Sequence, residues 1–304
     1  MSEPLFFAAT ALAENEARTA AIATQPSTYE SRSQRVQAEK ERLDRILVQL
    51  RKNVHPEANS AATQFSSVPE KPRSGSQLFA QRSTALAAGA VHTRLPARSY
   101  QPSWTNVGQQ PTYQQWRSLL AQEANQVKYQ SVGVLLGDSL SLWFPSDRLP
   151  QNRIWLNQAI SGDTTGGILN RLSSFAATRP QVIYLMAGVN DLKQGASDRT
   201  ILHNLRQITQ RLRQNHPQAR IVVQSILPTR SLPISSQRIV NLNRQLQAIA
   251  GQNGAYYLDV HSQMADQDGY LRSDLTTDGL HLNANGYAVW QAALSNADTY
   301  LAKR

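Results

Sequence analysis

Residues 113–304 predict an α/β domain built on a parallel β-sheet. Short apolar segments alternate with longer amphipathic segments along this part of the chain. The short segments are apolar at nearly every position, which is typical of strands that helices cover on both faces. Alternating strands and helices of this kind form a parallel sheet between two layers of helices.

The elements can be placed in order. A helix over 113–128 presents Trp116, Leu119 and Leu120 on one face. Five apolar runs are expected strands: 131–137, 153–159, 181–187, 220–227 and 255–260. Amphipathic spacing predicts four further helices: 165–177, 198–214, 235–252 and 284–302. Ligands of such sheets bind at the carboxyl ends of the strands, so polar residues that directly follow a strand are candidates for a site.

The charge of the chain suggests no particular partner. Its 304 residues carry 31 Lys+Arg and 21 Asp+Glu, a formal net charge of +10, which raises nucleic acid as a partner. However, residues 1–120 (14 basic, 9 acidic) and residues 121–304 (17 basic, 12 acidic) each contribute +5. No nucleic-acid-binding motif and no basic stripe with interleaved aromatic residues is visible, so we expect no nucleic-acid partner.

Several classes of site are excluded by residue content. The chain contains no cysteine, which rules out disulfides, thiolate nucleophiles and Cys-ligated zinc. No His-x-x-x-His pair, phosphate-binding glycine loop or dinucleotide fingerprint occurs. The segment 266–269 has too few ligand positions for a calcium loop. These patterns indicate neither a metal site nor a cofactor site.

Residues 1–55 are expected to form an N-terminal segment with a short amphipathic helix. Within residues 31–54, apolar residues share one stripe at near-heptad spacing: Val36, Leu43, Leu47, Leu50 and Val54. Lys40 interrupts this stripe, which is too short to predict a coiled coil. The simplest interpretation is a solvated helix, and the functional alternative is contact with a protein partner or an acidic surface.

The first residues carry a weak targeting signal. An apolar stretch ends in Ala11-Leu12-Ala13, as before a signal-peptide cleavage site, but Glu3 stands where such peptides carry basic residues. No apolar run approaches the ~18 residues of a membrane-spanning helix. A cytoplasmic location is therefore favoured, with secretion as the alternative.

Residues 56–112 are expected to be a disordered linker. They are rich in Ser, Ala, Gln, Pro and Gly and show little apolar periodicity. Such a composition buries too little surface to offset the entropy of ordering the chain. The folded domain is therefore expected to span residues 113–304.

Ser139 is the candidate nucleophile, because it directly follows the first expected strand. A serine in such a position is commonly only a helix cap or turn residue, and its hydroxyl needs a base to become a nucleophile. His281 lies three residues after Asp278 in a short turn, where a carboxylate can reach the imidazole Nδ1–H. The simpler alternative is a plain surface turn. The rival base is His261, which follows the last strand but has no comparably spaced acid.

Two further residues are candidates to stabilise an oxyanion. Asn190 follows the third strand, and its amide can donate to a developing negative charge, although asparagine there is also a common turn former. Gly162 follows the second strand and can expose a backbone N–H. Asp163, Thr164 and Thr165 are interpreted as capping residues of the next helix, without a chemical role.

Four short blocks thus occur in a fixed order: Gly137-Asp138-Ser139-Leu140, Ser161-Gly162-Asp163-Thr164, Gly188-Val189-Asn190-Asp191 and Asp278-Gly279-Leu280-His281. They resemble the blocks of the SGNH (GDSL-type) hydrolase family of serine esterases and lipases, over about residues 131–304. The resemblance implies a catalytic triad of Ser139, His281 and Asp278. It also implies an oxyanion hole formed by Ser139, Gly162 and Asn190. A flavodoxin-like, three-layer α/β/α fold with a five-stranded parallel sheet is implied as well, with no metal or cofactor.

The sequence therefore predicts a serine esterase that acts through an acyl-enzyme intermediate. Short, acetyl-type acyl groups are expected because no separate lid is evident, and the substrate is expected to be a small-molecule, carbohydrate or lipid ester. Lysophospholipase or lipase activity on longer chains is the alternative. A different class of function, a vestigial hydrolase that serves as a tethering module, also stays open. The apolar residues that follow Ser139 are interpreted either as an acyl pocket or as core: Leu140, Leu142, Trp143 and Phe144.

Overall fold

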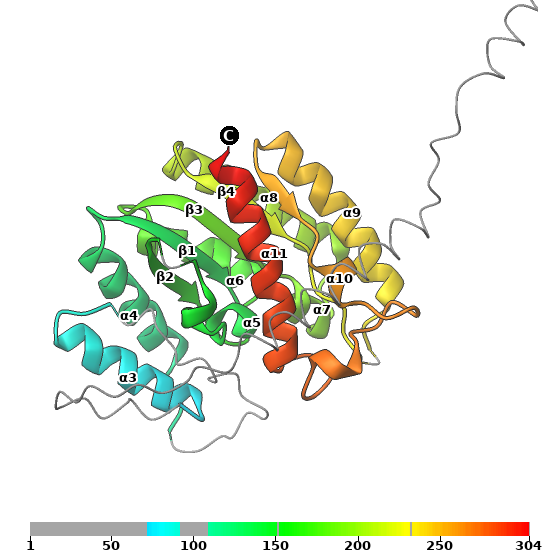
Figure 1. The fold of residues 1–304 in the computed structure, drawn as a ribbon, viewed down its shortest axis with the longest axis horizontal. Helices are drawn as coiled ribbons and strands as arrows, with labels where there is room; N and C mark the ends of the chain where they lie inside the picture. The colour runs from blue at the N-terminus through cyan, green and yellow to red at the C-terminus, as the bar shows by residue number, and fades with distance from the viewer. Residues whose placement is uncertain (1–71, 92–108, 151, 232, 304) are drawn as a thin grey trace, which may run out of the picture. The chain divides into compact units, whose positions relative to one another are not determined.

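The computed structural model describes residues 72–91, 109–150, 152–231 and 233–303, which all belong to the compact unit Ser67–Arg304. The N-terminal segment 1–55, including the predicted amphipathic helix, lies outside the described residues. A parallel sheet of five strands forms the centre of this unit, in the order β2-β1-β3-β4-β5 (Figure 1). This is the strand order of the flavodoxin-like fold, so the predicted fold class is confirmed.

The strands occupy the predicted apolar runs. Their bounds are β1 Ser131–Gly137, β2 Ile154–Ala159, β3 Arg179–Met186, β4 Arg220–Gln224 and β5 Tyr256–Leu258. Six of the seven residues of β1 are buried, which explains why its sequence does not alternate. The expected strand 220–227 is shorter in the structure, because its pairing ends at Gln224.

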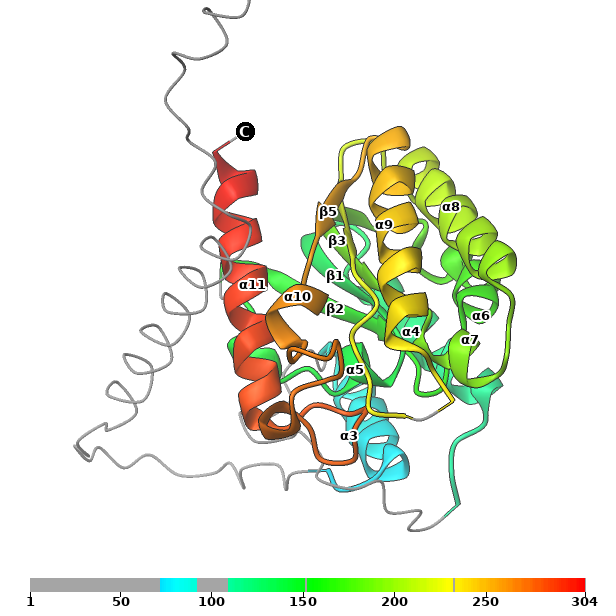
Figure 2. The same ribbon diagram turned by 90° about the vertical axis from the view of Figure 1, so that its right-hand side faces the viewer.

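Helices cover both faces of the sheet (Figure 2). On one side lie α4 Tyr113–Gln126, α6 Thr165–Asn170, α8 Asp198–Asn215 and α9 Ser236–Gln252. On the other side lie the short α10 His261–Met264 and the long α11 Ala284–Ala302. Helices α4, α6, α8, α9 and α11 each begin after a Ser, Thr or Asn whose side chain accepts a first-turn N–H.

The expected helix 165–177 is divided in the structure. Helix α6 ends at Asn170, and a 3₁₀ helix, Leu172–Phe175, follows. Arg171 lies at the break with φ −120° and ψ 11°, outside the α-helical region. Its side chain is fully buried and forms hydrogen bonds with backbone carbonyl groups of other segments. A regular amphipathic pattern cannot reveal this break, since the cause lies in tertiary contacts.

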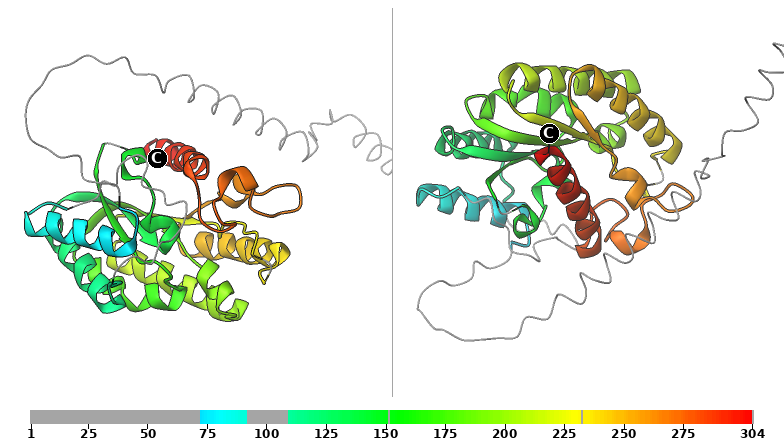
Figure 3. Two further views of the ribbon diagram at one scale, coloured as in Figure 1. Left: turned by 90° about the horizontal axis from the view of Figure 1, so that it is seen from below. Right: turned by 45° about the horizontal axis from the view of Figure 1, so that its top comes forward.

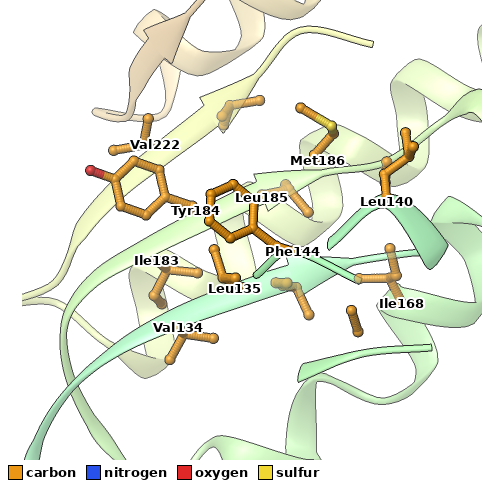
Figure 4. Close-up of a cluster of buried hydrophobic side chains, with 14 of the residues drawn as sticks. Val134, Leu135, Leu140, Phe144, Ile168, Ile183, Tyr184, Leu185, Met186 and Val222 are labelled. Atoms are coloured by element: carbon orange, nitrogen blue, oxygen red, sulfur yellow. The ribbon is translucent and has the colours of Figure 1, made fainter. Parts of the chain in front are cut away.

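Helix α11 is fixed to the sheet by aromatic residues. The Trp290 indole is fully buried, donates to Gln224 Oε1 at the end of β4 (2.6 Å) and meets Phe144 edge-on at a centroid distance of 5.0 Å. Tyr287 OH donates to the Leu140 carbonyl oxygen (2.9 Å). Phe144 and Leu140 belong to the buried cluster around β1 and β3 (Figure 4). These contacts hold the start of α11 close to the carboxyl end of β1.

The structure differs from the expected linker over 56–112, because residues 75–87 form a helix, α3 Gly75–Ala87 (Figure 3). Leu78 on α3 is buried in the core, and Phe79 packs edge-on against Trp116 of α4 at a centroid distance of 5.1 Å. Arg82 is also buried and donates from Nε to Glu123 Oε1 (2.9 Å) and from Nη2 to the Asn157 carbonyl oxygen (2.9 Å). Two apolar anchors and one buried ion pair thus hold a segment whose average composition suggests disorder.

We expect Glu123→Gln to destabilise the domain, because it leaves the buried Arg82 cation without its counter-charge. Removing one partner of a buried ion pair costs about 3 kcal/mol or more. Asp198→Asn is the control, since it breaks a partly exposed pair with Arg238, whose loss should cost less than about 1 kcal/mol. Urea unfolding measures both. Equal losses of unfolding free energy in the two variants would contradict the role of the ion pair.

Asp138, at the start of the short helix α5 Ser139–Leu142, is a buried carboxyl group. Its Oδ1 accepts the Leu140 N–H (3.0 Å), whereas Oδ2 is buried without a hydrogen-bond partner among the described residues. Burial raises the pKa of Asp138 to about 7. The Leu140 N–H opposes this shift, and the negative charges of Asp163 and Asp191 add to it.

We therefore expect Asp138→Asn to become more stable relative to wild type as the pH rises from 5 to 7.5. The unfolded carboxyl titrates near ~3.9, so between that value and about 7 the folded state holds one proton more than the unfolded state. Wild-type stability consequently falls through this window, whereas the amide of the variant does not titrate and lacks this dependence. Thermal unfolding of both proteins at the two pH values measures the difference. A Tm difference that does not change with pH would contradict the prediction.

Candidate active site

Ser139 lies at the carboxyl edge of the sheet, as expected. It is the first residue of α5, two residues after β1 ends, and only 6% of its surface is exposed. Its Oγ is 3.2 Å from Nε2 of His281. The structure thus brings together a hydroxyl and an imidazole that are 142 residues apart in sequence.

The ring of His281 is held by Asp278. Oδ2 of Asp278 is 2.6 Å from His281 Nδ1, and Oδ1 accepts the backbone N–H groups of Leu280 (3.0 Å) and His281 (2.7 Å). Partial burial would raise the pKa of Asp278, but the hydrogen bonds from the His281 ring and from the two backbone N–H groups outweigh it and lower the pKa. An ionised Asp278 can hold the Nδ1–H tautomer, in which Nε2 carries no hydrogen and can accept a proton.

The loop that contains Thr229 and Arg230 forms hydrogen bonds with the turn that carries Asp278 and His281. The Gly279 carbonyl oxygen accepts the Arg230 backbone N–H (2.8 Å) and the Thr229 hydroxyl (3.0 Å). The Thr276 hydroxyl accepts the Gly279 N–H (2.9 Å) and donates to the His281 carbonyl oxygen (2.7 Å). Gly279 has a φ of +84°, a conformation that a residue with a side chain rarely adopts. Thr229, Arg230 and Thr276 were not anticipated from sequence, since only their contacts identify them.

The residues expected to donate to an oxyanion follow three adjacent strands. Parallel pairing aligns Gly137 of β1 with Ala159 of β2 and with Met186 of β3. Ser139, Gly162 and Asn190 come two, three and four residues after these aligned positions, so they emerge at one edge of the sheet.

Each of these residues has a donor available. In the described part of the chain, the backbone N–H groups of Ser139 and Gly162 have no acceptor. Gly162 has a φ of +76°, which favours glycine there. Asn190, in α7 Val189–Lys193, donates one Nδ2 hydrogen to the Asp163 carbonyl oxygen (3.0 Å), and its second hydrogen remains for a ligand.

His261, the rival base, is not the histidine that meets Ser139. It is 7% exposed at the start of α10, and its Nε2 has no hydrogen-bond partner among the described residues. Burial lowers the pKa of His261, and the nearby charge of Asp259 opposes this shift. The backbone N–H of His261 donates to Ser225 Oγ (2.7 Å). The spacing argument that favoured His281 agrees with the observed geometry.

The structure assigns contacts to two residues that had been interpreted only as caps. Thr164 does cap α6, with its hydroxyl accepting the Gly167 N–H (3.2 Å). Asp163 instead forms a buried ion pair with Arg171 (2.6 Å), and Thr165 donates from its backbone N–H (2.8 Å) and its hydroxyl (2.5 Å) to Asp191. The sequence did not identify Arg171 as the partner of Asp163. Its one sequence signal is a charge within a largely apolar stretch, residues 168–172.

The apolar residues after Ser139 belong to the core. Leu140, Leu142, Trp143 and Phe144 are each at most 2% exposed. Phe144 packs edge-on against Tyr287 as well as Trp290. Of the two interpretations, acyl pocket or core, the structure supports the core.

Two further features bear on the class of site. Among the described residues, no three or more His, Cys, Asp or Glu side chains are grouped so that they could hold a metal ion. None of the described helices is both long enough and apolar enough to cross a membrane.

The chain is similar to known proteins in sequence and in fold. The chain is 31% identical over 170 residues to platelet-activating factor acetylhydrolase IB subunit alpha1 of Pongo abelii, a match that covers 51% of this chain and 70% of that protein. The Homo sapiens subunit alpha1 is 29% identical over 170 residues, which cover 51% and 69%. The crystal structure of a GDSL-like lipase from Bacteroides thetaiotaomicron has a TM-score of 0.51 at 19% identity, over 60% of this chain and 96% of that one, which is a likeness of fold alone.

The family is identified by a match to most of the chain. Residues 99–289 match the GDSL-like Lipase/Acylhydrolase family, which agrees with the resemblance carried by the four blocks. Ester hydrolysis is the reaction class of this family. The chain therefore belongs to the GDSL-like lipase/acylhydrolase family of ester hydrolases.

Proposed function

We propose that this ester hydrolase is a serine esterase in which Ser139 is the nucleophile, His281 the base and Asp278 the residue that orients the base. One observation carries the proposal: Ser139 Oγ, His281 and Asp278 form a continuous chain of hydrogen bonds, 3.2 Å and 2.6 Å long, at the carboxyl edge of the sheet. A serine hydroxyl becomes an effective nucleophile when a base within hydrogen-bond reach removes its proton.

In the proposed reaction, His281 Nε2 takes the proton of Ser139 as Oγ attacks the ester carbonyl carbon. The tetrahedral intermediate collapses, His281 returns the proton to the departing alcohol, and an acyl group stays on Ser139. His281 then takes a proton from water, and the water oxygen attacks the acyl-enzyme. The bond between the acyl carbon and Ser139 Oγ breaks, His281 returns the proton to Oγ, and the acid leaves. Asp278 stabilises the imidazolium that forms in each step, for which its lowered pKa is suited because it stays ionised.

The negative charge of the tetrahedral intermediate needs donors. We assign this role to the N–H groups of Ser139 and Gly162 and to the free Nδ2 hydrogen of Asn190. Two of these are backbone groups whose positions are set by the ends of β1 and β2. Donors fixed before the reaction stabilise a developing charge at little reorganisation cost.

Short acyl groups, of the acetyl type, are the proposed substrates. Ser139 is nearly buried, and the apolar residues beside it are already used in the core. In addition, the curated relatives are named as acetylhydrolases of platelet-activating factor. Longer-chain lipase or lysophospholipase activity is the competing possibility, and a chain-length series distinguishes the two.

We expect hydrolysis of p-nitrophenyl esters to be fastest for acetate and to fall as the acyl chain lengthens to palmitate. Ser139→Ala and His281→Ala should each lower kcat by at least ~10³-fold, because each removes a member of the proposed triad. Circular dichroism confirms that the variants are folded. Full activity of Ser139→Ala would refute the nucleophile, whereas a maximum at long chains would refute only the acetyl preference. A wild-type protein that neither hydrolyses these esters nor reacts with a fluorophosphonate probe would favour the tethering module.

The N-terminal segment is proposed to act outside catalysis, through contact of residues 31–54 with a protein partner or an acidic surface. Deletion of residues 1–66 should leave kcat on soluble esters within about twofold, because every described catalytic contact lies in Ser67–Arg304. The cut is placed before α3, since α3 packs into the core. Steady-state kinetics of the shortened and full-length chains make the comparison. Loss of turnover with the fold retained would assign residues 1–66 a role at the site.

A further inference from the structure

A single buried guanidinium, that of Arg171, connects the segments that lead to the proposed oxyanion donors. Nε of Arg171 donates to Asp163 Oδ2 (2.6 Å), Nη1 to the Gln158 carbonyl oxygen (2.7 Å) and Nη2 to the Gly137 carbonyl oxygen (3.1 Å). Gly137 ends β1, and Gln158 is the last but one residue of β2. One side chain therefore fixes the ends of two adjacent strands to the loop that follows the second strand.

Asp163 extends this connection to the third strand. It directly follows Gly162, and its backbone carbonyl oxygen accepts the Asn190 Nδ2 hydrogen (3.0 Å). Asp191, the residue after Asn190, accepts two hydrogen bonds from Thr165. These bonds attach α7, which carries Asn190, to the start of α6. Each proposed donor is thus bonded to Asp163 or lies within two residues of a group held by Arg171.

The close packing around this pair is specific. A Cβ atom on Gly167 would lie 1.9 Å from Asp163 Oδ1, so this position requires glycine for the carboxylate to be seated. Both side chains of the pair are at most 2% exposed. Burying two charges is costly, and a buried ion pair often adds little net stability compared with apolar residues. Stability alone is thus a weak reason for this arrangement, whereas control of position is a strong one.

We propose that Arg171, together with Asp163, is a positioning residue of the oxyanion hole. This inference rests on the proposed serine esterase mechanism. The pair sets the spacing of the Ser139 N–H, the Gly162 N–H and the Asn190 amide, which must all reach one oxygen atom. Donors act best about 2.7–3.1 Å from that oxygen, and a displacement of about 1 Å can cost ~10²-fold in rate. Because the oxyanion exists only after attack, the loss is expected in kcat and not in KM.

The test compares two buried arginines in the full-length protein, with p-nitrophenyl acetate as substrate. Arg171→Met is expected to lower kcat by about 10²-fold with KM within about threefold, and Arg171→Lys to recover part of kcat. Arg82→Met is the matched control, since Arg82 is also buried, paired with a carboxylate and bonded to a backbone carbonyl. It should lower Tm while leaving kcat within about threefold. Equal kcat losses in Arg171→Met and Arg82→Met would overturn the proposal.

A double-mutant cycle with Asn190→Ala separates positioning from general damage. If Arg171 acts through the oxyanion hole, adding Arg171→Met to Asn190→Ala should cost much less than it costs in wild type. Losses that simply multiply would also overturn the proposal. Should Arg171→Met fail to fold, Asp163→Asn keeps the volume and one acceptor oxygen and enters the same cycle. Fluorophosphonate labelling of Ser139 keeps the two proposals distinct: a labelled variant with wild-type kcat refutes only the role of Arg171, and an unlabelled wild type refutes the mechanism.

Discussion

The parallel pairing of β2, β1 and β3 is the constraint on which the site depends. Parallel strands end at the same edge, and their register aligns Gly137, Ala159 and Met186 in one row. Short loops beyond this row then carry Ser139, Gly162 and Asn190, which are far apart in sequence. A slip of one residue in any of the three strands would turn its side chains to the opposite face and displace its loop. The core that fixes the register therefore also fixes the chemistry.

The same fold gives aspartates with opposite properties. Asp278 lies in a partly exposed turn and accepts three hydrogen bonds, which lower its pKa and keep it ionised beside His281. Asp138 is fully buried, with one hydrogen bond from a neighbouring N–H, and its pKa is raised to about 7. Asp163 is buried too, which raises its pKa, but Arg171 opposes that shift and supplies a counter-charge. Environment, and not residue type, decides which carboxylate can orient a base.

The last helix connects the packing of the core to the position of His281. Only two residues separate His281 from the start of α11, so the position of its ring depends on where that helix docks. Trp290 and Tyr287 dock it against Gln224, Phe144 and Leu140, and Leu140 directly follows Ser139. Buried aromatic contacts thus connect the two ends of the Ser139–His281 hydrogen bond. These contacts explain why Ser139 and His281 lie within hydrogen-bond distance although they are far apart in sequence.

The sequence by itself determined the strands, most helices, the fold class and the four blocks, because apolar periodicity and short motifs are local properties. The Asp278–His281 turn belongs to this group, since a three-residue spacing suffices to join its two side chains. Only the tertiary structure decided between core and pocket for Leu140 and Phe144, ordered α3 through the Arg82–Glu123 pair, and broke the expected helix at Arg171. These outcomes depend on partners 8 to 147 residues away, and a local pattern carries no information about such partners.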